Sequence, residues 1–130
     1  MAGNGLTSRC LICRVGQDRR WGDAESRVGD VVLNVRAAVL AGLQIQQAGH
    51  LAFVPHLFHF AHYLMPLGYE AWMTIDLRML RRCDVLLRLP GYSPGADREV
   101  ELAKTLGMPI YETVEACLAD MPVLAGGGVA

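Results

Sequence analysis

The chain of 130 residues has almost no net charge and no long apolar run. Its 12 lysines and arginines are balanced by 13 aspartates and glutamates, for a formal net charge of −1 at pH 7. A protein that binds a nucleic acid polymer usually has an excess of basic residues, and this chain has no such excess. No apolar run reaches the ~18 residues that a membrane-spanning helix needs, and the N-terminus lacks a basic segment followed by an apolar one. We therefore expect a cytoplasmic protein that has neither a nucleic acid polymer nor a membrane as its partner.

Cysteine is also scarce, and the four thiols lack the spacing of a zinc or redox site. Cys10 and Cys13 form a CxxC motif, but the surrounding sequence RCLICRV predicts a buried strand, in which the two side chains point to opposite faces. A redox pair normally lies at a strand-to-helix junction, and a zinc site would need a second pair of ligands. We therefore expect structural cysteines.

What the chain does contain is a regular alternation of apolar strands and helices. The predicted strands are residues 10–15, 50–55, 84–89 and 108–111, and the predicted helices are residues 31–48, 69–82, 96–106 and 113–119. This order is typical of a parallel sheet covered on both faces, so we expect a three-layer α/β fold, flavodoxin-like or Rossmann-like, with four to five strands. We expect one domain over residues 1–121 and a disordered tail over residues 122–130.

Two segments of this assignment depend on local signals. The first long helix would have Asp30 as its cap. Its apolar stripe is Val32, Val35, Val39 and Leu43. The segment 56–68 is aromatic and ambiguous, and we expect a loop with a short helix. Its closely spaced histidines suggest a metal site, but the many Phe and Pro residues around them favour packing instead.

One glutamate lies where an apolar residue is expected. In the helix over 96–106, the stripe of Leu102, Ala103 and Leu106 extends backward to Glu99 by the i, i+3, i+4, i+7 rule. We place Glu99 in the first turn of this helix, where free N–H groups and the helix dipole favour an ionised carboxylate. The alternative is a first-turn glutamate that serves only its own helix, as in a capping box.

A second acid interrupts an apolar face in the helix over 69–82. Asp76 lies in the middle of that face. Its other members are Tyr69, Trp72, Met73, Met79, Leu80 and Cys83. Because an isolated buried carboxylate is unfavourable, Asp76 needs a partner or a function. The alternative is a partly exposed aspartate bonded to a nearby loop. Two carboxylates offered by neighbouring helices to one crevice, Asp76 and Glu99, indicate acid–base or nucleophilic chemistry at a sugar.

The turn before Glu99 adds a possible phosphate site. In folds of this class, ligands bind beyond the carboxyl ends of the strands, and the sequence PGYSPGAD follows such an end. Ser93 supplies a hydroxyl and Gly95 allows close backbone approach, just ahead of a helix N-terminus. The alternative is that this turn only connects two elements.

These stretches also carry a resemblance to a known family. Residues 34–50, 54–60 and 69–111 resemble the nucleoside 2-deoxyribosyltransferase superfamily, in particular its small bacterial and phage branch, which is similar to the deoxynucleoside 5′-monophosphate N-hydrolases. The last stretch is the most specific. It has an Asp-Leu pair on a helix, a Cys-Asp pair before an apolar strand, and then a glycine turn and a glutamate at fixed spacing.

The resemblance implies a role for each candidate residue. Glu99 matches the catalytic glutamate, which would attack the anomeric carbon and form a covalent glycosyl–enzyme intermediate. Asp76 matches the aspartate that binds substrate and manages the proton on the leaving base. Ser93 matches the serine that contacts the 5′-phosphate in the N-hydrolases, where the transferases that use free nucleosides have an aspartate. This favours a nucleoside 5′-monophosphate, although Asp97 is an acid close to that phosphate.

Other residues are expected to contact the substrate or a second copy. By the resemblance, the substrate-binding residues also include Gly95, Asp97, His56 and His59, the two histidines as possible walls of the base pocket. The superfamily needs no metal and forms homodimers or larger assemblies, so we expect a homo-oligomer with no bound metal and no cofactor. The aromatic stretch 57–63 and the face of Trp72 and Met73 are the expected contacts.

The first strand departs from the family pattern. Members usually have small residues and a glycine turn at its end, where this chain has Arg14 and Val15. The departure leaves open a second hypothesis, in which the chain is a nucleotide-binding module that keeps the fold without catalysis. A third hypothesis is a structural or interaction protein in which Asp76 and Glu99 affect only stability.

Overall fold

The computed structural model describes residues 9–12, 24–91 and 93–121. The side chains of Leu11, His59 and residues 24–32 are not among the described groups. The expectations for Cys13, Arg14, Val15 and the tail 122–130 therefore lie outside the described residues.

Four parallel strands form the sheet of the described residues. They are β1 (Arg9–Ile12), β2 (Leu51–Phe53), β3 (Val85–Leu87) and β4 (Ile110–Tyr111), in the order β2-β1-β3-β4. In this register, Cys10 lies between Ala52 and Val85, and Leu86 pairs with Ile110. The order is that of a flavodoxin-like sheet, in which the chain reverses its direction of winding between β1 and β3.

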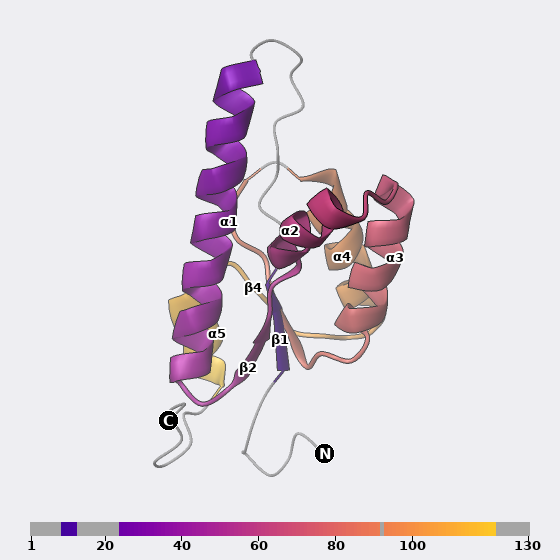
Figure 1. Cartoon of the computed structure of the whole chain (residues 1–130). Coiled ribbons are helices and arrows are strands. Elements are labelled where there is room, and N and C mark those ends of the chain that lie inside the picture. The colour runs from indigo at the N-terminus through magenta and orange to yellow at the C-terminus, as the bar shows by residue number, and fades with distance from the viewer. Residues whose placement is uncertain (1–8, 13–23, 92, 122–130) are drawn as a thin grey trace.

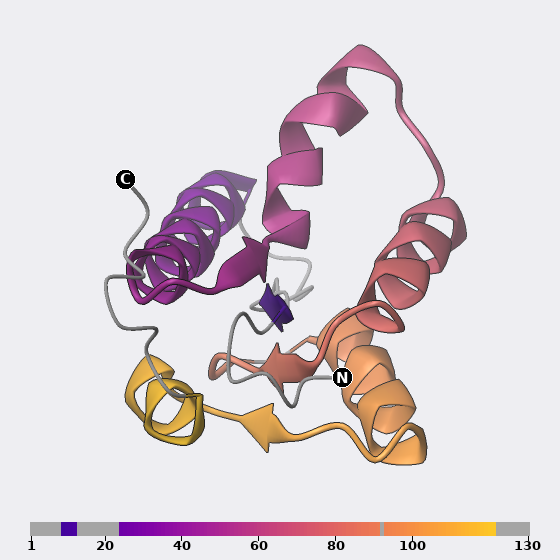
Figure 2. The same ribbon diagram turned by 90° about the horizontal axis from the view of Figure 1, so that it is seen from below.

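Helices cover both faces of this sheet (Figures 1 and 2). They are α1 (Ala24–Gln47), the 3₁₀ helix η2 (Pro55–Leu57), α2 (Phe58–Leu64), α3 (Tyr69–Leu80), α4 (Pro94–Thr105) and α5 (Val114–Asp120). Helices α1 and α5 lie on one face, and α3 and α4 lie on the other (Figure 2). The predicted three-layer α/β fold is confirmed. Within the described residues, no helix combines the length and the hydrophobicity that a membrane span requires.

The core is divided by the sheet because successive strand residues point to opposite faces. Val85 and Leu87 pack in the cluster under α1 and α5. Leu86, between them, packs with Ala96, Ala103 and Leu80 of the other cluster, under α3 and α4. The continuous apolar sequence of β3 is therefore explained, since both of its faces are buried.

Two predictions about α1 are wrong. The helix begins at Ala24, so Asp30 lies inside it and does not cap it. The side chains that face the sheet are Ala38, Ala41 and Ile45, whereas Leu43 is 48% exposed. Small side chains on this face let α1 approach the sheet closely, and a pattern of large apolar residues cannot detect them.

The aromatic segment after β2 forms η2 and α2, as the predicted loop with a short helix suggested. Phe58 stacks on Trp72 with ring centroids 5.4 Å apart, and Phe53 meets Phe58 edge to face at 5.8 Å. These rings attach the inner side of α2 to α3. Met73 is fully buried within the chain, so its side chain is not available for a contact with another copy.

Candidate active site

Helices α3 and α4 lie side by side on one face of the sheet, and both begin near the edge where the strands end (Figures 1 and 2). Gly95, in the first turn of α4, lies against α3. A Cβ atom on Gly95 would lie 3.3 Å from Met73 Sδ, 3.4 Å from Tyr69 Oη and 3.9 Å from Ser93 Oγ. A glycine here therefore keeps the two helices close together.

Asp76 of α3 and Glu99 of α4 are both buried. Their residues are 1% and 0% exposed. Asp76 is three residues beyond Met73 and Glu99 is four residues beyond Gly95, so the two acids lie about 4.5 and 6 Å further along their helices than this contact. The structure therefore brings both acids to a similar depth on the buried faces of neighbouring helices.

The position of Glu99 within its helix differs from the prediction. Helix α4 begins at Pro94, two residues earlier than expected, and Ser93 is its N-cap. Glu99 is consequently in the second turn, and the predicted first-turn position is wrong. A capping-box glutamate would have to be the third helical residue, and that residue is Ala96. Glu99 therefore does not form a capping box, which was the alternative that the sequence left open.

Ser93 lies at the carboxyl end of β3 and is 5% exposed. Its Oγ accepts a hydrogen bond of 3.0 Å from the backbone N–H of Ala96. Serine is among the best N-cap residues because its side chain satisfies one of the free N–H groups of the first turn. Ser93, which was predicted to contact a phosphate, is therefore also the N-cap of α4.

Arg88 organises the turn between β3 and α4. Its guanidinium donates hydrogen bonds to the carbonyl oxygens of Leu89 and Gly91, the latter at 2.7 Å. Gly91 has a φ of 137°, which favours glycine. Arg88 was predicted to be part of a strand, and this function was not predicted. The signal was available, since a charged residue ends an otherwise apolar run.

Asp97 is not brought into the buried contact of the two other acids. Its side chain is 68% exposed, and Arg88 Nη2 lies 3.5 Å from its Oδ1. The charge of Asp97 is thus partly compensated by the arginine that fixes the turn. Its repulsion of an anionic ligand at Ser93 is correspondingly smaller than the sequence alone indicated.

Tyr69 is a further residue of this site, although its sequence position predicted only a place on an apolar face. Arg98 lies 5.8 Å from the centre of its ring and forms a two-fold hydrogen bond with Glu70, at 2.9 and 3.2 Å. Glu70 also raises the pKa of Arg98 above its usual value, through this hydrogen bond first. The pair joins the first turn of α3 to α4, beside Tyr69.

The histidines occupy separate positions. His56 is buried in η2, with 4% exposed. The side chain of His59 lies outside the described groups, so its predicted place in a base pocket stays a prediction. Nδ1 of His62 accepts hydrogen bonds from Trp72 Nε1 at 2.9 Å and from the backbone N–H of Leu67 at 3.2 Å. Within the described part of the chain, no three His, Cys, Asp or Glu side chains are grouped to hold a metal ion.

Cys10 and Cys83 are not activated as nucleophiles, and Cys117, whose pKa is lowered by the hydrogen bond with Cys10, is fully buried. Hydrogen bonding to Cys117, together with burial, raises the pKa of Cys10 far above its usual value. Burial raises the pKa of Cys83 to about 11. Because the thiolate is the reactive form, neither thiol is poised for catalysis near neutral pH.

One comparison with known families gives a match. A family described as a domain of unknown function (DUF4406) matches residues 28–112. The match runs from α1 to β4 and includes Asp76, Ser93 and Glu99. No curated protein matches the chain at a significant level. Since the matched region is more than half of the sequence, the chain belongs to the DUF4406 family.

Proposed function

We propose that the chain is an N-glycosidase or N-glycosyltransferase, acting without a metal, that cleaves the N-glycosidic bond of a nucleoside 5′-monophosphate or a nucleoside. The observation that carries this proposal is the pair of buried carboxylates, Asp76 and Glu99, at a similar depth on adjacent helices. The relation of DUF4406 to the nucleoside 2-deoxyribosyltransferase-like fold supports the same chemistry.

In this proposal Glu99 is the nucleophile. Its carboxylate attacks C1′ of the sugar, the C1′–N bond breaks, and the bonding electrons leave with the base. Asp76, in its protonated form, supplies the proton that the departing nitrogen needs. The transition state has oxocarbenium character, which an anionic Glu99 stabilises before it forms the ester. Water or a second base then attacks C1′, Asp76 takes back the proton that the attacking group loses, and the ester bond between C1′ and Glu99 breaks.

Ser93 and Arg88 support a phosphorylated substrate over a free nucleoside. The Ser93 oxygen accepts from Ala96, and its own hydrogen can still be donated to a phosphate oxygen. The first turn of α4 adds a favourable dipole. Asp97, the acid closest in sequence, is paired with Arg88. We therefore expect the 5′-monophosphate to be the better substrate.

The experiment is chromatographic detection of free base. Wild type and Glu99→Ala are incubated with ribo- and deoxyribonucleosides and with their 5′-monophosphates, each with and without a second base as acceptor. Release of base by wild type alone supports the glycosidase and identifies the substrate. Dependence on the acceptor base distinguishes a transferase from a hydrolase.

A second candidate function is a nucleotide-binding module of the same fold. Glu99 has no exposed surface, so a substrate could reach it only after the covering side chains move. Arg14 and Val15 at the end of the first strand also depart from the family pattern. A module of this kind would be stabilised against heat by a nucleotide and yet release no base. The melting temperature, measured with the same panel, separates the two functions.

A further inference from the structure

The hydroxyl group of Tyr69 lies beside the first turn of α4. Tyr69 is the first residue of α3 and is 38% exposed. Its Oη lies 3.4 Å from the position that a Cβ atom on Gly95 would take, and Ser93 Oγ lies 3.9 Å from the same position. The structure therefore brings two hydroxyl groups, one from the start of α3 and one from the N-cap of α4, to the same glycine.

The backbone of this turn adds a third donor. Pro94 has no N–H group. The N–H of Ala96 is donated to Ser93 Oγ at 3.0 Å, and the N–H of Asp97 is donated to the carbonyl oxygen of Ser93 at 2.9 Å. The N–H of Gly95 is the group that the cap does not use, and an anion at the start of a helix accepts from such a group. Two hydroxyl groups and one N–H thus lie around Gly95.

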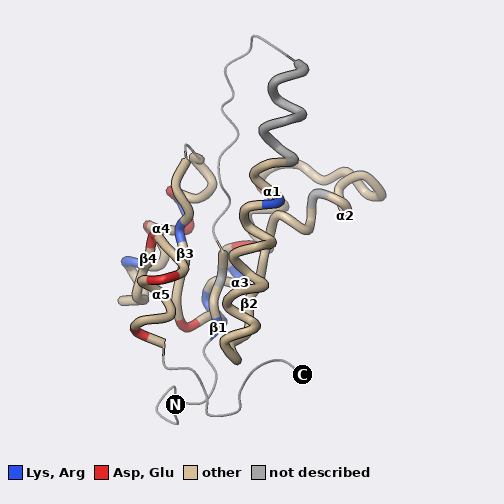
Figure 3. Tube along the Cα trace, turned by 90° about the vertical axis from the view of Figure 1, so that its left-hand side faces the viewer, with Lys and Arg blue, Asp and Glu red and all other residues tan. Residues whose placement is uncertain are grey.

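The cations near this turn are already paired with acids. Arg88 Nη2 lies 3.5 Å from Asp97 Oδ1, and Arg98 Nη1 lies 2.9 Å from Glu70 Oε1. Helix α2 adds no charge, since residues 55–69 contain no Lys, Arg, Asp or Glu (Figure 3). A phosphate at the start of α4 would therefore depend on neutral hydrogen-bond donors more than on an unpaired cation.

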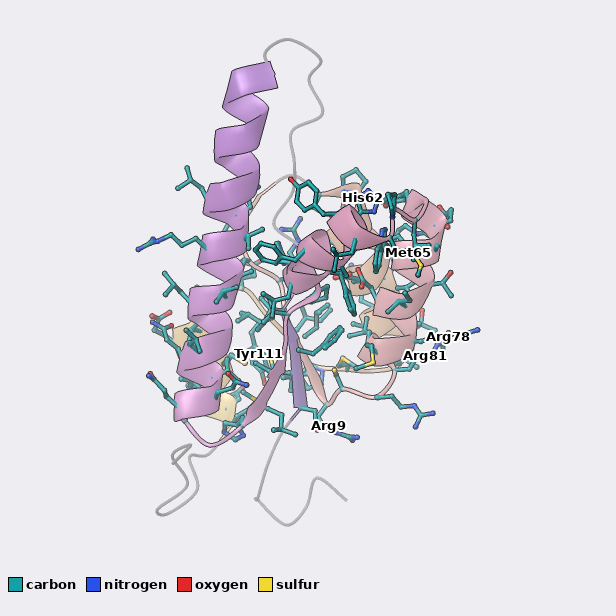
Figure 4. All side chains as sticks on the ribbon, viewed as in Figure 1. Arg9, His62, Met65, Arg78, Arg81 and Tyr111 are labelled. Atoms are coloured by element: carbon teal, nitrogen blue, oxygen red, sulfur yellow. The ribbon has the colours of Figure 1, made fainter. Side chains whose placement is uncertain are left out.

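Other arginines are too far away to change this conclusion. Figure 4 shows His62 and Met65 at the end of α2 that lies beside the start of α3. The labelled arginines Arg9, Arg78 and Arg81 lie at the opposite end of the molecule in the same view. Helix α3 therefore directs its last arginines away from the start of α4, and its contribution there is the hydroxyl group of its first residue.

Arg98 prepares this hydroxyl group as a donor. Its guanidinium carbon lies 5.8 Å from the centre of the Tyr69 ring. The hydrogen bond with Glu70 first, and one with the Tyr69 hydroxyl second, raise the pKa of Arg98 above its usual value. Because arginine only donates, the Tyr69 oxygen is the acceptor in this bond. A hydroxyl that accepts from a cation is polarised and donates its own hydrogen more strongly.

We propose that Tyr69 is a specificity-determining residue, whose hydroxyl donates a hydrogen bond to the 5′-phosphate of the substrate beside Ser93 and the N–H of Gly95. This inference rests on the proposed function for the identity of the ligand. The three terminal oxygens of a phosphate can accept from three donors that lie around one point. The 5′-hydroxyl of a free nucleoside has a single oxygen with two lone pairs, so it leaves at least one of these donors without a partner. Tyr69 thus favours the monophosphate over the nucleoside.

The test compares the dissociation constants of the ribo- and deoxyribonucleosides with those of their 5′-monophosphates, measured by titration calorimetry. It is made in the Glu99→Gln background, so that the ligand stays intact. Adding Tyr69→Phe removes only the hydroxyl and keeps the ring. The affinity for the monophosphate should fall by about tenfold or more, and that for the nucleoside should stay within about twofold. Tyr63→Phe is the matched control, since Tyr63 is a tyrosine of α2 and is 72% exposed. It should change neither constant.

Circular dichroism and the melting temperature establish that each variant is folded. An equal loss of affinity for both ligands in Tyr69→Phe would assign Tyr69 to packing alone and would overturn the proposal. An unchanged preference for the monophosphate would overturn it too, as would the absence of any such preference in the protein that keeps Tyr69. Release of base by wild type is measured separately. A preference that depends on Tyr69 in a protein that releases no base would support this inference and overturn the proposed activity.

Discussion

At the scale of single residues, Glu99 and Asp76 are set apart by burial. They are 0% and 1% exposed, whereas Glu101 and Asp97 on the same helix as Glu99 are exposed. Burying a carboxylate is unfavourable unless its surroundings compensate, so an acid in such a place needs a specific reason. Both were predicted from the sequence because each interrupts an apolar stripe. Tyr69 and Arg88 were not predicted, because their contacts come from residues on other elements or from the turn geometry.

Asp84 gives a prediction about pH at this scale. Its carboxylate accepts from the Arg9 backbone N–H at 2.7 Å and from the guanidinium of Arg9 at 3.1 and 3.2 Å. The hydrogen bond to Arg9 lowers the pKa of Asp84 below its usual 3.8. Its contribution to stability is therefore complete above the pKa of the unfolded chain and is lost as pH falls through the lower folded value.

The measurement is urea unfolding of wild type and Asp84→Asn at pH 7 and at pH 2.5. At pH 7 the variant should have a free energy of unfolding about 1 kcal/mol lower, since an exposed or half-exposed ion pair contributes modestly. The difference should shrink at pH 2.5. Glu112→Gln, at an exposed position, is the control. An equal difference at both values of pH would show that the charge of Asp84 does not matter.

At the scale of elements, the beginning of α4 is the most informative feature. Ser93 caps α4 through Ala96, and Thr113 caps α5 in the same way through Ala116 at 3.1 Å. Ser93→Ala and Thr113→Ala should each lower the free energy of unfolding by about 1 kcal/mol. Only Ser93→Ala should also weaken the binding of a nucleoside 5′-monophosphate, measured by titration calorimetry. Equal binding by both variants would limit Ser93 to its capping role.

Ser93→Asp separates capping from phosphate binding. Aspartate caps a helix about as well as serine, so stability should change by less than about 0.5 kcal/mol. Its charge would face the phosphate, and the preference for the monophosphate over the nucleoside should fall by at least about tenfold. The measurement compares the two dissociation constants. An unchanged preference would place the phosphate elsewhere.

The packing of α1 on the sheet gives a prediction about stability. A Cβ atom on Gly42 would lie 2.8 Å from Val54 Cγ2, on a stiff β-branched side chain, whereas one on Gly68 would meet nothing within 4 Å. Gly42→Ser should lower the free energy of unfolding by about 1–3 kcal/mol through overpacking. Gly68→Ser should be neutral or slightly stabilising, since Gly68 is the N-cap of α3. Equal stabilities, measured by urea unfolding, would contradict this account of the contact.

The helices and strands also show which parts of the fold could be predicted from the sequence. Periodicity identified the four strands and the helices α1, α3, α4 and α5, because the apolar pattern is local, but it left the segment that forms η2 and α2 ambiguous. It failed where a helix begins at a residue outside the pattern, as at Ala24 and Pro94. It also failed on the buried face of α1, where Ala38 and Ala41 are small and carry little apolar weight. Contacts between elements decide these features, and no local pattern contains them.

At the scale of the whole molecule, the two edges of the sheet differ. At the amino end, the ion pair between Arg9 and Asp84 links β1 to the start of β3. At the carboxyl end, the turn fixed by Arg88 leads to Ser93 and α4. The alternation of elements predicted a parallel sheet with a ligand edge, but the order of its strands required the structure. That order places the reversal between β1 and β3, next to the candidate site.

The central claim is that Glu99 is the nucleophile of this site, and the rate of base release from the preferred substrate tests it most directly. The rate is compared for wild type, Glu99→Gln and Glu101→Gln. Glu101 lies two residues away on the same helix but is exposed. Glu99→Gln should be slower by at least about 10³-fold, as expected for loss of a nucleophile, and Glu101→Gln should be within about twofold of wild type. A folded Glu99→Gln variant that releases base as fast as wild type would contradict the claim.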